Sequence, residues 1–209
     1  MIYLYRQPEQ NEQLVIGADP SEGRDYSAFV VISKKYADVV MLGRSKTESP
    51  QLGYELNHVG QYLKKRTNIL PTIAVERNTG AATIHVLKTL NYAKLFKMPR
   101  SFTTSQQEIT DDYGWSTNTA TRPKMLDDLA LAVRQRSIKI YSKELIDEMF
   151  TFIRNAKTGK PQADVGSNDD LVMSTAICWQ LYQIVPVHQT DSYYYQRPEY
   201  KPYDPVIGI

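Results

Sequence analysis

The hydrophobic and polar positions of this chain fall into short apolar runs and amphipathic stretches, which together predict an α/β fold. The run from Leu14 to Asp19 is apolar until its last residue and predicts a buried strand. Two runs rich in Val and Ile, at 28–33 and 38–44, follow over short connections, as in an antiparallel meander. Further strands are predicted at 72–76 and 138–141.

Apolar residues at helical spacing predict helices between and after these strands. The first begins near Pro50, since proline is favoured in the first turn of a helix. The predicted helices cover approximately 50–63, 81–90, 121–133, 142–150 and 169–182, the last beginning at Asp169 or Asp170. The stretch 98–120 is polar and irregular, and 152–164 predicts a hairpin with its turn at 157–160.

The chain is predicted to hold one folded domain, because 209 residues suit a single core. We place this domain at 13–184, after a polar linker or frayed end at 1–12 and before an extended tail rich in Tyr and Pro at 185–209. No apolar run approaches the roughly 18 to 20 residues of a membrane-spanning helix, and the first residues lack the pattern of a signal peptide. The single cysteine, Cys178, excludes an internal disulfide and predicts a buried thiol in a reducing compartment.

The charge is distributed unevenly, although the net charge is only +2. Residues 88–164 hold thirteen basic and nine acidic residues, and the rest of the chain carries an excess of acid. A basic middle opposite an acidic cluster suits a polyanion held across metal ions, although an excess of this size is common by chance.

Candidate chemistry lies in acidic residues at the ends of strands and at the start of a helix. Asp19 and Glu76 each close a predicted buried strand, and Asp169 and Asp170 open the last helix. The loop after Asp19 contains a glycine and is expected to return Asp25 to the same place. Carboxylates brought together repel one another, and divalent cations relieve that repulsion.

Each of these residues also has an ordinary interpretation. An Asp at a strand end most often belongs to a turn, and an acidic pair at a helix start usually caps the helix dipole. Asn168 is an equally good cap, which leaves Asp169 and Asp170 available for other work. A strand-end Asp, a second-strand carboxylate and a helix-start Asp in this order favour the arrangement used by ribonuclease H-like nucleases.

Four ordered stretches extend the similarity beyond the fold, to a particular family. They are Gly17-Ala18-Asp19-Pro20 with Gly23, Asp25 and Ser27; Val75-Glu76-Arg77-Asn78; Gly114-Trp115-Ser116-Thr117 with Thr121-Arg122-Pro123; and Ser167-Asn168-Asp169-Asp170-Leu171 with Ala176. With these stretches the chain resembles the C-terminal nuclease domain of the large terminase subunit of tailed bacteriophages. Asn168 departs from the pattern, since many relatives carry His there, and this puts an imidazole ligand in doubt.

The resemblance implies a ribonuclease H-like mixed sheet, with an antiparallel three-strand meander plus parallel strands, flanked by helices. It implies that Asp19, Glu76 and Asp170 are the catalytic metal ligands, that Asp169 also binds metal, and that Asp25 supports them. The site offers only oxygen ligands, so the expected ions are Mg²⁺ or Mn²⁺. The resemblance implies two of them. The residues expected to contact DNA phosphates are Arg122, Lys124, Lys157 and Lys160.

The function implied by this resemblance is a metal-dependent endonuclease of double-stranded DNA. It would cut concatemeric viral DNA during genome packaging, in the cytoplasm of a bacterial host, with little sequence preference. The expected partners are a packaging ATPase domain, the portal and the small terminase subunit. The ATPase would lie outside this sequence, which has no phosphate-binding Gly-x-x-x-x-Gly-Lys-Ser/Thr loop.

Three alternatives remain open at this point. One is a junction resolvase-type nuclease on the same fold. Another is a nucleotide-binding domain of the actin and sugar-kinase type, although the second Gly-rich turn it needs is missing. The third is a non-catalytic docking module for DNA packaging, in which the carboxylates are only caps.

Overall fold

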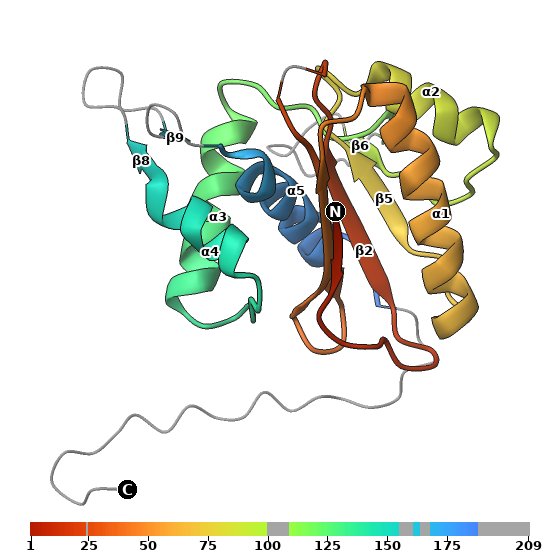
Figure 1. Cartoon of the computed structure of the whole chain (residues 1–209), viewed down its shortest axis with the longest axis horizontal. Coiled ribbons are helices and arrows are strands. Elements are labelled where there is room, and N and C mark those ends of the chain that lie inside the picture. Colours follow the sequence, from red (N-terminus) through yellow and green to blue (C-terminus); the bar gives the residue numbers. More distant parts are fainter. Residues whose placement is uncertain (24, 100–108, 155–160, 164–167, 188–209) are drawn as a thin grey trace, which may run out of the picture.

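A computed structural model describes residues 1–23, 25–99, 109–154, 161–163 and 168–187 (Figure 1). The helices are α1 (Ser49–Thr67), α2 (Ala81–Thr89), α3 (Thr121–Arg134), α4 (Lys143–Thr151) and α5 (Asp170–Ile184). The strands are β1 (Ile2–Leu4), β2 (Leu14–Asp19), β3 (Ser27–Ser33), β4 (Val39–Ser45), β5 (Thr72–Val75), β6 (Lys97–Pro99), β7 (Ile109–Tyr113), β8 (Phe152–Arg154) and β9 (Pro161–Ala163).

The central sheet has five strands in the order β1-β4-β3-β2-β5. Strands β1, β4, β3 and β2 pair antiparallel, whereas β5 pairs parallel to β2. This confirms the mixed sheet predicted from the sequence, with its three-strand meander followed by a parallel strand. None of the helices in the described part of the chain combines the length and apolar character that crossing a membrane requires.

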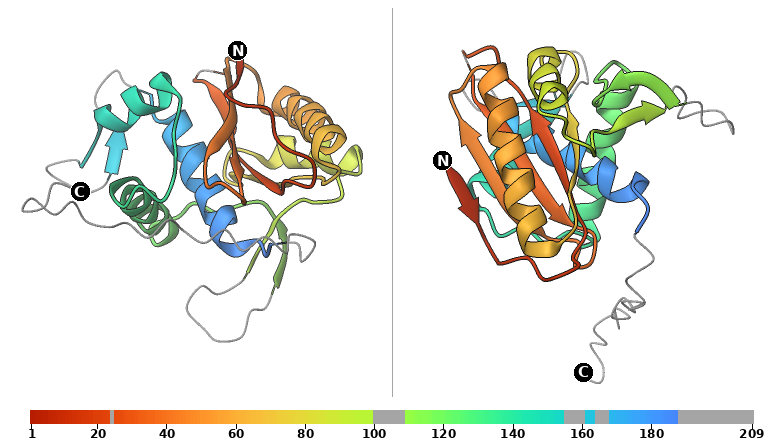
Figure 2. Two further views of the ribbon diagram at one scale, coloured as in Figure 1. Left: turned by 90° about the horizontal axis from the view of Figure 1, so that it is seen from below. Right: turned by 90° about the vertical axis from the view of Figure 1, so that its right-hand side faces the viewer.

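Helices cover both faces of this sheet, which explains why its central strands are apolar at nearly every position. Helices α1 and α2 lie on one face, where Leu52 and Leu56 of α1 pack with Ile16 and Phe29. Helix α5 lies on the opposite face, with α3 and α4 beyond it (Figure 2). Because α5 is enclosed on all sides, every residue from Asp170 to Leu181 is buried.

Three parts of the sequence prediction are wrong about local structure. Ile2–Leu4 is an edge strand that pairs with β4, so this segment is not a frayed end. Residues 109–113 form β7, which pairs with β6 inside the stretch expected to be irregular. Residues 138–141 make only a single bridge, between Asp38 and Lys139, because β1 already occupies the free edge of β4.

The predicted hairpin after α4 is confirmed, because β8 and β9 pair antiparallel. Its turn lies outside the described residues, as does most of the predicted tail. The boundary at 184 and the extended tail after it therefore stay predictions.

Candidate active site

Asp19 and Glu76 lie side by side because β2 and β5 run parallel. Ala18 pairs with Val75 in the ladder, and the Glu76 amide donates a hydrogen bond to the Ala18 carbonyl at 2.8 Å. The last residue of β2 and the residue after β5 therefore meet at the carboxyl edge of the sheet. Thr79 holds the Glu76 side chain, since its amide and its hydroxyl donate to Oε2 at 3.1 and 2.9 Å.

Helix α5 brings Asp170 to the same edge by packing directly on β2. A Cβ atom at Gly17 would overlap backbone atoms of Ser174 and Cys178, so only glycine permits this approach. The Cys178 thiol, which is buried as predicted, donates to the Val15 carbonyl at 3.3 Å. Asp170 lies about two helical turns before Cys178, toward the end of β2 that carries Asp19.

The carboxyl groups are near enough to perturb one another electrostatically. Burial raises the pKa of Asp19 well above its ordinary value, and the charges of Glu76, Asp170 and Asp169 raise it further. Burial also raises the pKa of Asp170 to about 7, with contributions from Glu148, Asp169 and Asp25. The acidic residues that the sequence singled out therefore lie within electrostatic range of one another.

Asp170 also has an unusual hydrogen-bonding state. The residue is only 8% exposed, and its Oδ2 atom is buried without a hydrogen-bond partner among the described residues. A buried oxygen without a partner is costly, so such an atom requires an explanation. One such explanation is that this oxygen interacts with a bound ligand in the functional state.

The residues predicted to contact DNA differ in how near they lie to the carboxylates. Arg122 belongs to the site itself, since its Nη2 lies 3.1 Å from Oδ2 of Asp169. Lys124 pairs with Asp128 one turn further along α3, at 2.6 Å. Lys157 and Lys160 lie outside the described residues. Trp115 is buried at 2% exposure and stacks on Phe96.

Glu148 of α4 is a site neighbour that the sequence analysis missed. Its Oε1 lies 2.6 Å from Nη1 of Arg44, and its Oε2 accepts hydrogen bonds from the amides of Leu171 and Val172. One sequence signal could have revealed it. Glu148 follows the buried Leu145 by three positions, which places a charged residue on the apolar face of the helix.

Asp19, Glu76, Asp169 and Asp170 offer the type of donor atom that Mg²⁺ and Mn²⁺ prefer, namely carboxylate oxygens. One of these is the buried Oδ2 of Asp170, which has no hydrogen-bond partner among the described residues. Across the described ranges, no group of three or more His, Cys, Asp or Glu side chains is arranged so that it could hold a metal ion.

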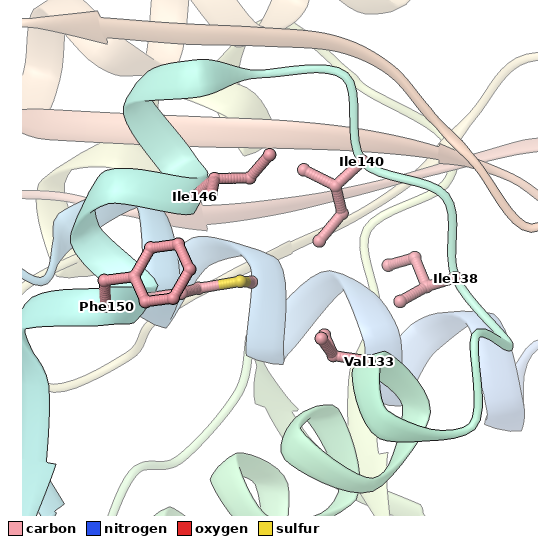
Figure 3. A pocket seen from close by; sticks show the side chains of 6 residues that line it. Val133, Ile138, Ile140, Ile146 and Phe150 are labelled. Carbon is pink, nitrogen blue, oxygen red and sulfur yellow. The ribbon is translucent and has the colours of Figure 1, made fainter.

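A separate apolar depression of about 360 Å³ lies between α3 and α4 (Figure 3). Its lining consists of Val133, Ile138, Ile140, Ile146, Met149 and Phe150. None of these side chains ionises, and only the Met149 thioether is a weak hydrogen-bond acceptor, so the depression offers no general acid or base. The carboxylate edge of the sheet is thus the candidate active site.

Comparison with known proteins gives matches at the level of structure. No family model matches the chain, and no curated protein matches its sequence. The large terminase nuclease of the thermophilic phage G20c aligns with a TM-score of 0.65 at 17% identity, covering 87% of this chain and 88% of that one. This chain has the large terminase nuclease fold.

Two further terminase nucleases share that fold. The nuclease domain of Thermus phage P74-26 aligns with a TM-score of 0.60 at 18% identity, over 90% of this chain and 89% of that one. The human cytomegalovirus terminase nuclease domain aligns with a TM-score of 0.54 at 11% identity, over 85% and 86%. The terminase nuclease fold therefore extends over nearly the whole chain, and the ribonuclease H-like prediction is confirmed.

Proposed function

We propose that this chain is a divalent-metal-dependent endonuclease that cuts double-stranded DNA during viral genome packaging. The observation that carries the proposal is the set of carboxylates at one sheet edge, where Asp19 and Asp170 have raised pKa values and Asp170 keeps a buried oxygen that no described residue hydrogen-bonds. The fold supports the same function, because its neighbours are terminase nucleases.

In this proposal Asp19, Glu76 and Asp170 hold Mg²⁺ or Mn²⁺, and Asp169 completes the binding of a second ion. Structures of the G20c nuclease contain bound magnesium, cobalt and zinc, which supports the binding of a divalent ion by this chain. When bound, such a pair of ions supplies an activated water and stabilises the leaving 3′ oxygen.

The chain itself positions the ligands and controls their protonation. Thr79 fixes Glu76, and Arg122 fixes Asp169. Burial raises the pKa of Asp170 to about 7, so in the metal-free protein this group is partly protonated near neutral pH. That proton relieves the repulsion among the carboxylates until a cation replaces it.

DNA would lie across this edge, with its phosphates facing the carboxylates through the bound ions. We assign Lys124, Lys157 and Lys160 to contacts with the flanking backbone, and Asp25 to support of the metal site. Phosphate contacts carry little sequence information, so cleavage should show little sequence preference. The packaging ATPase, the portal and the small terminase subunit are the proposed partners, in the cytoplasm of a bacterial host.

The deciding experiment incubates supercoiled plasmid with the protein in Mg²⁺, Mn²⁺, Ca²⁺ or EDTA. We expect nicking and linearisation in Mn²⁺ or Mg²⁺, none in EDTA, and none with Asp19→Asn in any metal. Asp147→Asn is the matched control, because it removes an exposed carboxylate of α4 and should leave cleavage unchanged. Cleavage that persists in EDTA would refute the role of metal.

The same assay separates the alternative functions. A four-way junction cut in preference to linear duplex would indicate a resolvase. Binding of DNA without cleavage in any metal would indicate a docking module. Sequencing of the cut ends would measure the sequence preference.

A further inference from the structure

The first turn of α5 lacks a cap of its own. A residue at the N-cap normally accepts hydrogen bonds from the second or third amide of its helix. Asp169 occupies the N-cap of α5, yet its side chain makes no such bond. The backbone amides that Asp169 does not cap are those of Leu171 and Val172, directly after the candidate ligand Asp170.

Glu148 supplies that cap from another helix. Its Oε2 accepts from the Leu171 amide at 3.0 Å and from the Val172 amide at 3.4 Å, across 23 and 24 positions of sequence. The residue is 7% exposed, so both bonds form away from water. With the amides occupied in this way, the Asp169 side chain pairs with Arg122 instead.

Arg44 in turn fixes Glu148. Its Nη1 lies 2.6 Å from Oε1 of Glu148, and its guanidinium carbon lies 4.3 Å from the centre of the Tyr26 ring. The two carboxylate oxygens of Glu148 therefore bind different elements: Oε1 contacts β4 and Oε2 contacts α5. A single side chain connects the sheet, α4 and the start of α5.

We propose that Glu148 is a positioning residue for the carboxylate site. By holding the first turn of α5, it fixes where Asp170 stands relative to Asp19 and Glu76. Misplacement of a reacting or ligating group by about 1 Å can cost about 100-fold in rate, so the position of this turn matters for activity. This inference rests on the proposed nuclease function.

The test compares Glu148→Ala and Glu148→Gln with wild type and with the neighbouring control Asp147→Asn. Glutamine keeps an oxygen that can accept from Leu171 and Val172 but loses the ionic bond to Arg44, so it should lie between wild type and alanine. Three quantities are measured: hydrogen exchange of the Leu171 and Val172 amides in EDTA, kcat and KM for plasmid cleavage, and the rise in Tm caused by Mn²⁺.

For Glu148→Ala we expect faster exchange of the two amides and a smaller rise in Tm with Mn²⁺. We expect kcat to fall by roughly 10- to 100-fold, as for other residues that orient metal ligands, while KM for DNA stays near wild type. Asp147→Asn should match wild type in all three measurements. If the alanine variant does not fold, the glutamine variant decides the question.

A merely structural role predicts a different result. Glu148→Ala would then lower Tm, but kcat measured well below Tm and the rise in Tm with Mn²⁺ would both equal those of wild type. That outcome would overturn the proposal. If wild type cleaves no DNA in any metal, the proposed function fails, and the rise in Tm with Mn²⁺ alone then supports or overturns the positioning role.

Discussion

Asp170 and Asp169 are neighbours in sequence with different surroundings. Asp170 is buried with an oxygen that has no partner among the described residues, whereas Asp169 has a side chain 33% exposed and pairs with Arg122. Asp169 is the N-cap and lies outside the helix, whereas Asp170 is the first residue of α5, so the two carboxylates need not serve the same ion.

We predict that Asp170→Ala is inactive in both Mg²⁺ and Mn²⁺, whereas Asp169→Ala keeps some activity in Mn²⁺. Mn²⁺ tolerates an incomplete oxygen shell better than Mg²⁺, which demands near-ideal octahedral geometry. Plasmid cleavage by the two variants in each metal is the measurement. Equal residual activity, or the reverse order, would show that the two roles are assigned wrongly.

The raised pKa of Asp170 predicts that the metal-free protein loses stability as pH rises. The folded carboxyl group keeps its proton up to about pH 7, whereas the unfolded one loses it near pH 4. The folded state therefore binds more protons across this window, and the stability that this group contributes is lost as pH rises toward and through 7. Raised pKa values at Asp19 and Glu148 act in the same direction.

Thermal unfolding in EDTA between pH 5.5 and 8 measures this effect. Each kcal/mol corresponds to about 2–4 °C in a chain of this size, so a fall in Tm of several degrees is expected. Asp170→Asn should flatten the dependence and raise Tm at pH 8, because it removes one charge from the cluster. A Tm that rises with pH in wild type would contradict the assignment of the raised pKa.

At the scale of elements, the contact of α5 with β2 decides where the active site forms. This contact needs glycine at position 17, since any Cβ there meets the helix backbone. Gly43 is also closely packed, but a Cβ there would meet the ring of Phe29 instead. The two glycines thus differ in whether the obstructing atoms can move.

We predict that Gly17→Ala destabilises the protein by about 1–3 kcal/mol or more and lowers cleavage, because α5 must shift away from β2. Cys178→Ala should not restore the stability of Gly17→Ala, since the obstructing atoms belong to the backbone.

Gly43→Ala should also destabilise the protein, but Phe29→Leu should partly restore its stability by removing the ring. Urea unfolding of the single and double variants measures both, and rescue of Gly17→Ala by Cys178→Ala would disprove the backbone argument.

At the scale of the whole molecule, the N-terminal segment closes one edge of the sheet. Arg6 donates to Glu12 and to Asp38, and the side chains of these two acids are 0% and 3% exposed. The segment expected to be frayed is therefore attached to the sheet through β1 and through this buried ionic network. Removal of the Arg6 side chain would leave both buried carboxylates without an ionic partner among the described residues.

We predict that Arg6→Ala lowers the free energy of unfolding by about 3–5 kcal/mol, the usual cost of removing one partner of a buried ion pair. Lys35→Ala is the matched control, because it removes an exposed pair with Glu9 and should change stability by no more than about 1 kcal/mol. Urea unfolding of both variants is the measurement. An equally small effect for both would show that the Arg6 network contributes little to folding.

The sequence by itself determined the features that arise from local pattern. The apolar run ending at Asp19 predicted β2 with its observed bounds, and the run before Glu76 predicted β5. Helical spacing predicted α1 to α5, because amphipathic periodicity and capping residues act within a few positions of the chain. The order of carboxylates along these elements was enough to name Asp19, Glu76, Asp169 and Asp170 as one candidate site.

Only the tertiary structure decided the features that join distant positions. β1 is three residues long and shows no period of its own, so its pairing with β4 could not be read from sequence. The bonds from Glu148 to the start of α5 cross 23 and 24 positions, and the pair of Arg122 with Asp169 crosses 47. Burial raises the pKa of Asp170 and encloses its Oδ2 atom, which has no hydrogen-bond partner within the described part of the chain. Burial depends on which elements enclose a group, and packing alone settles that.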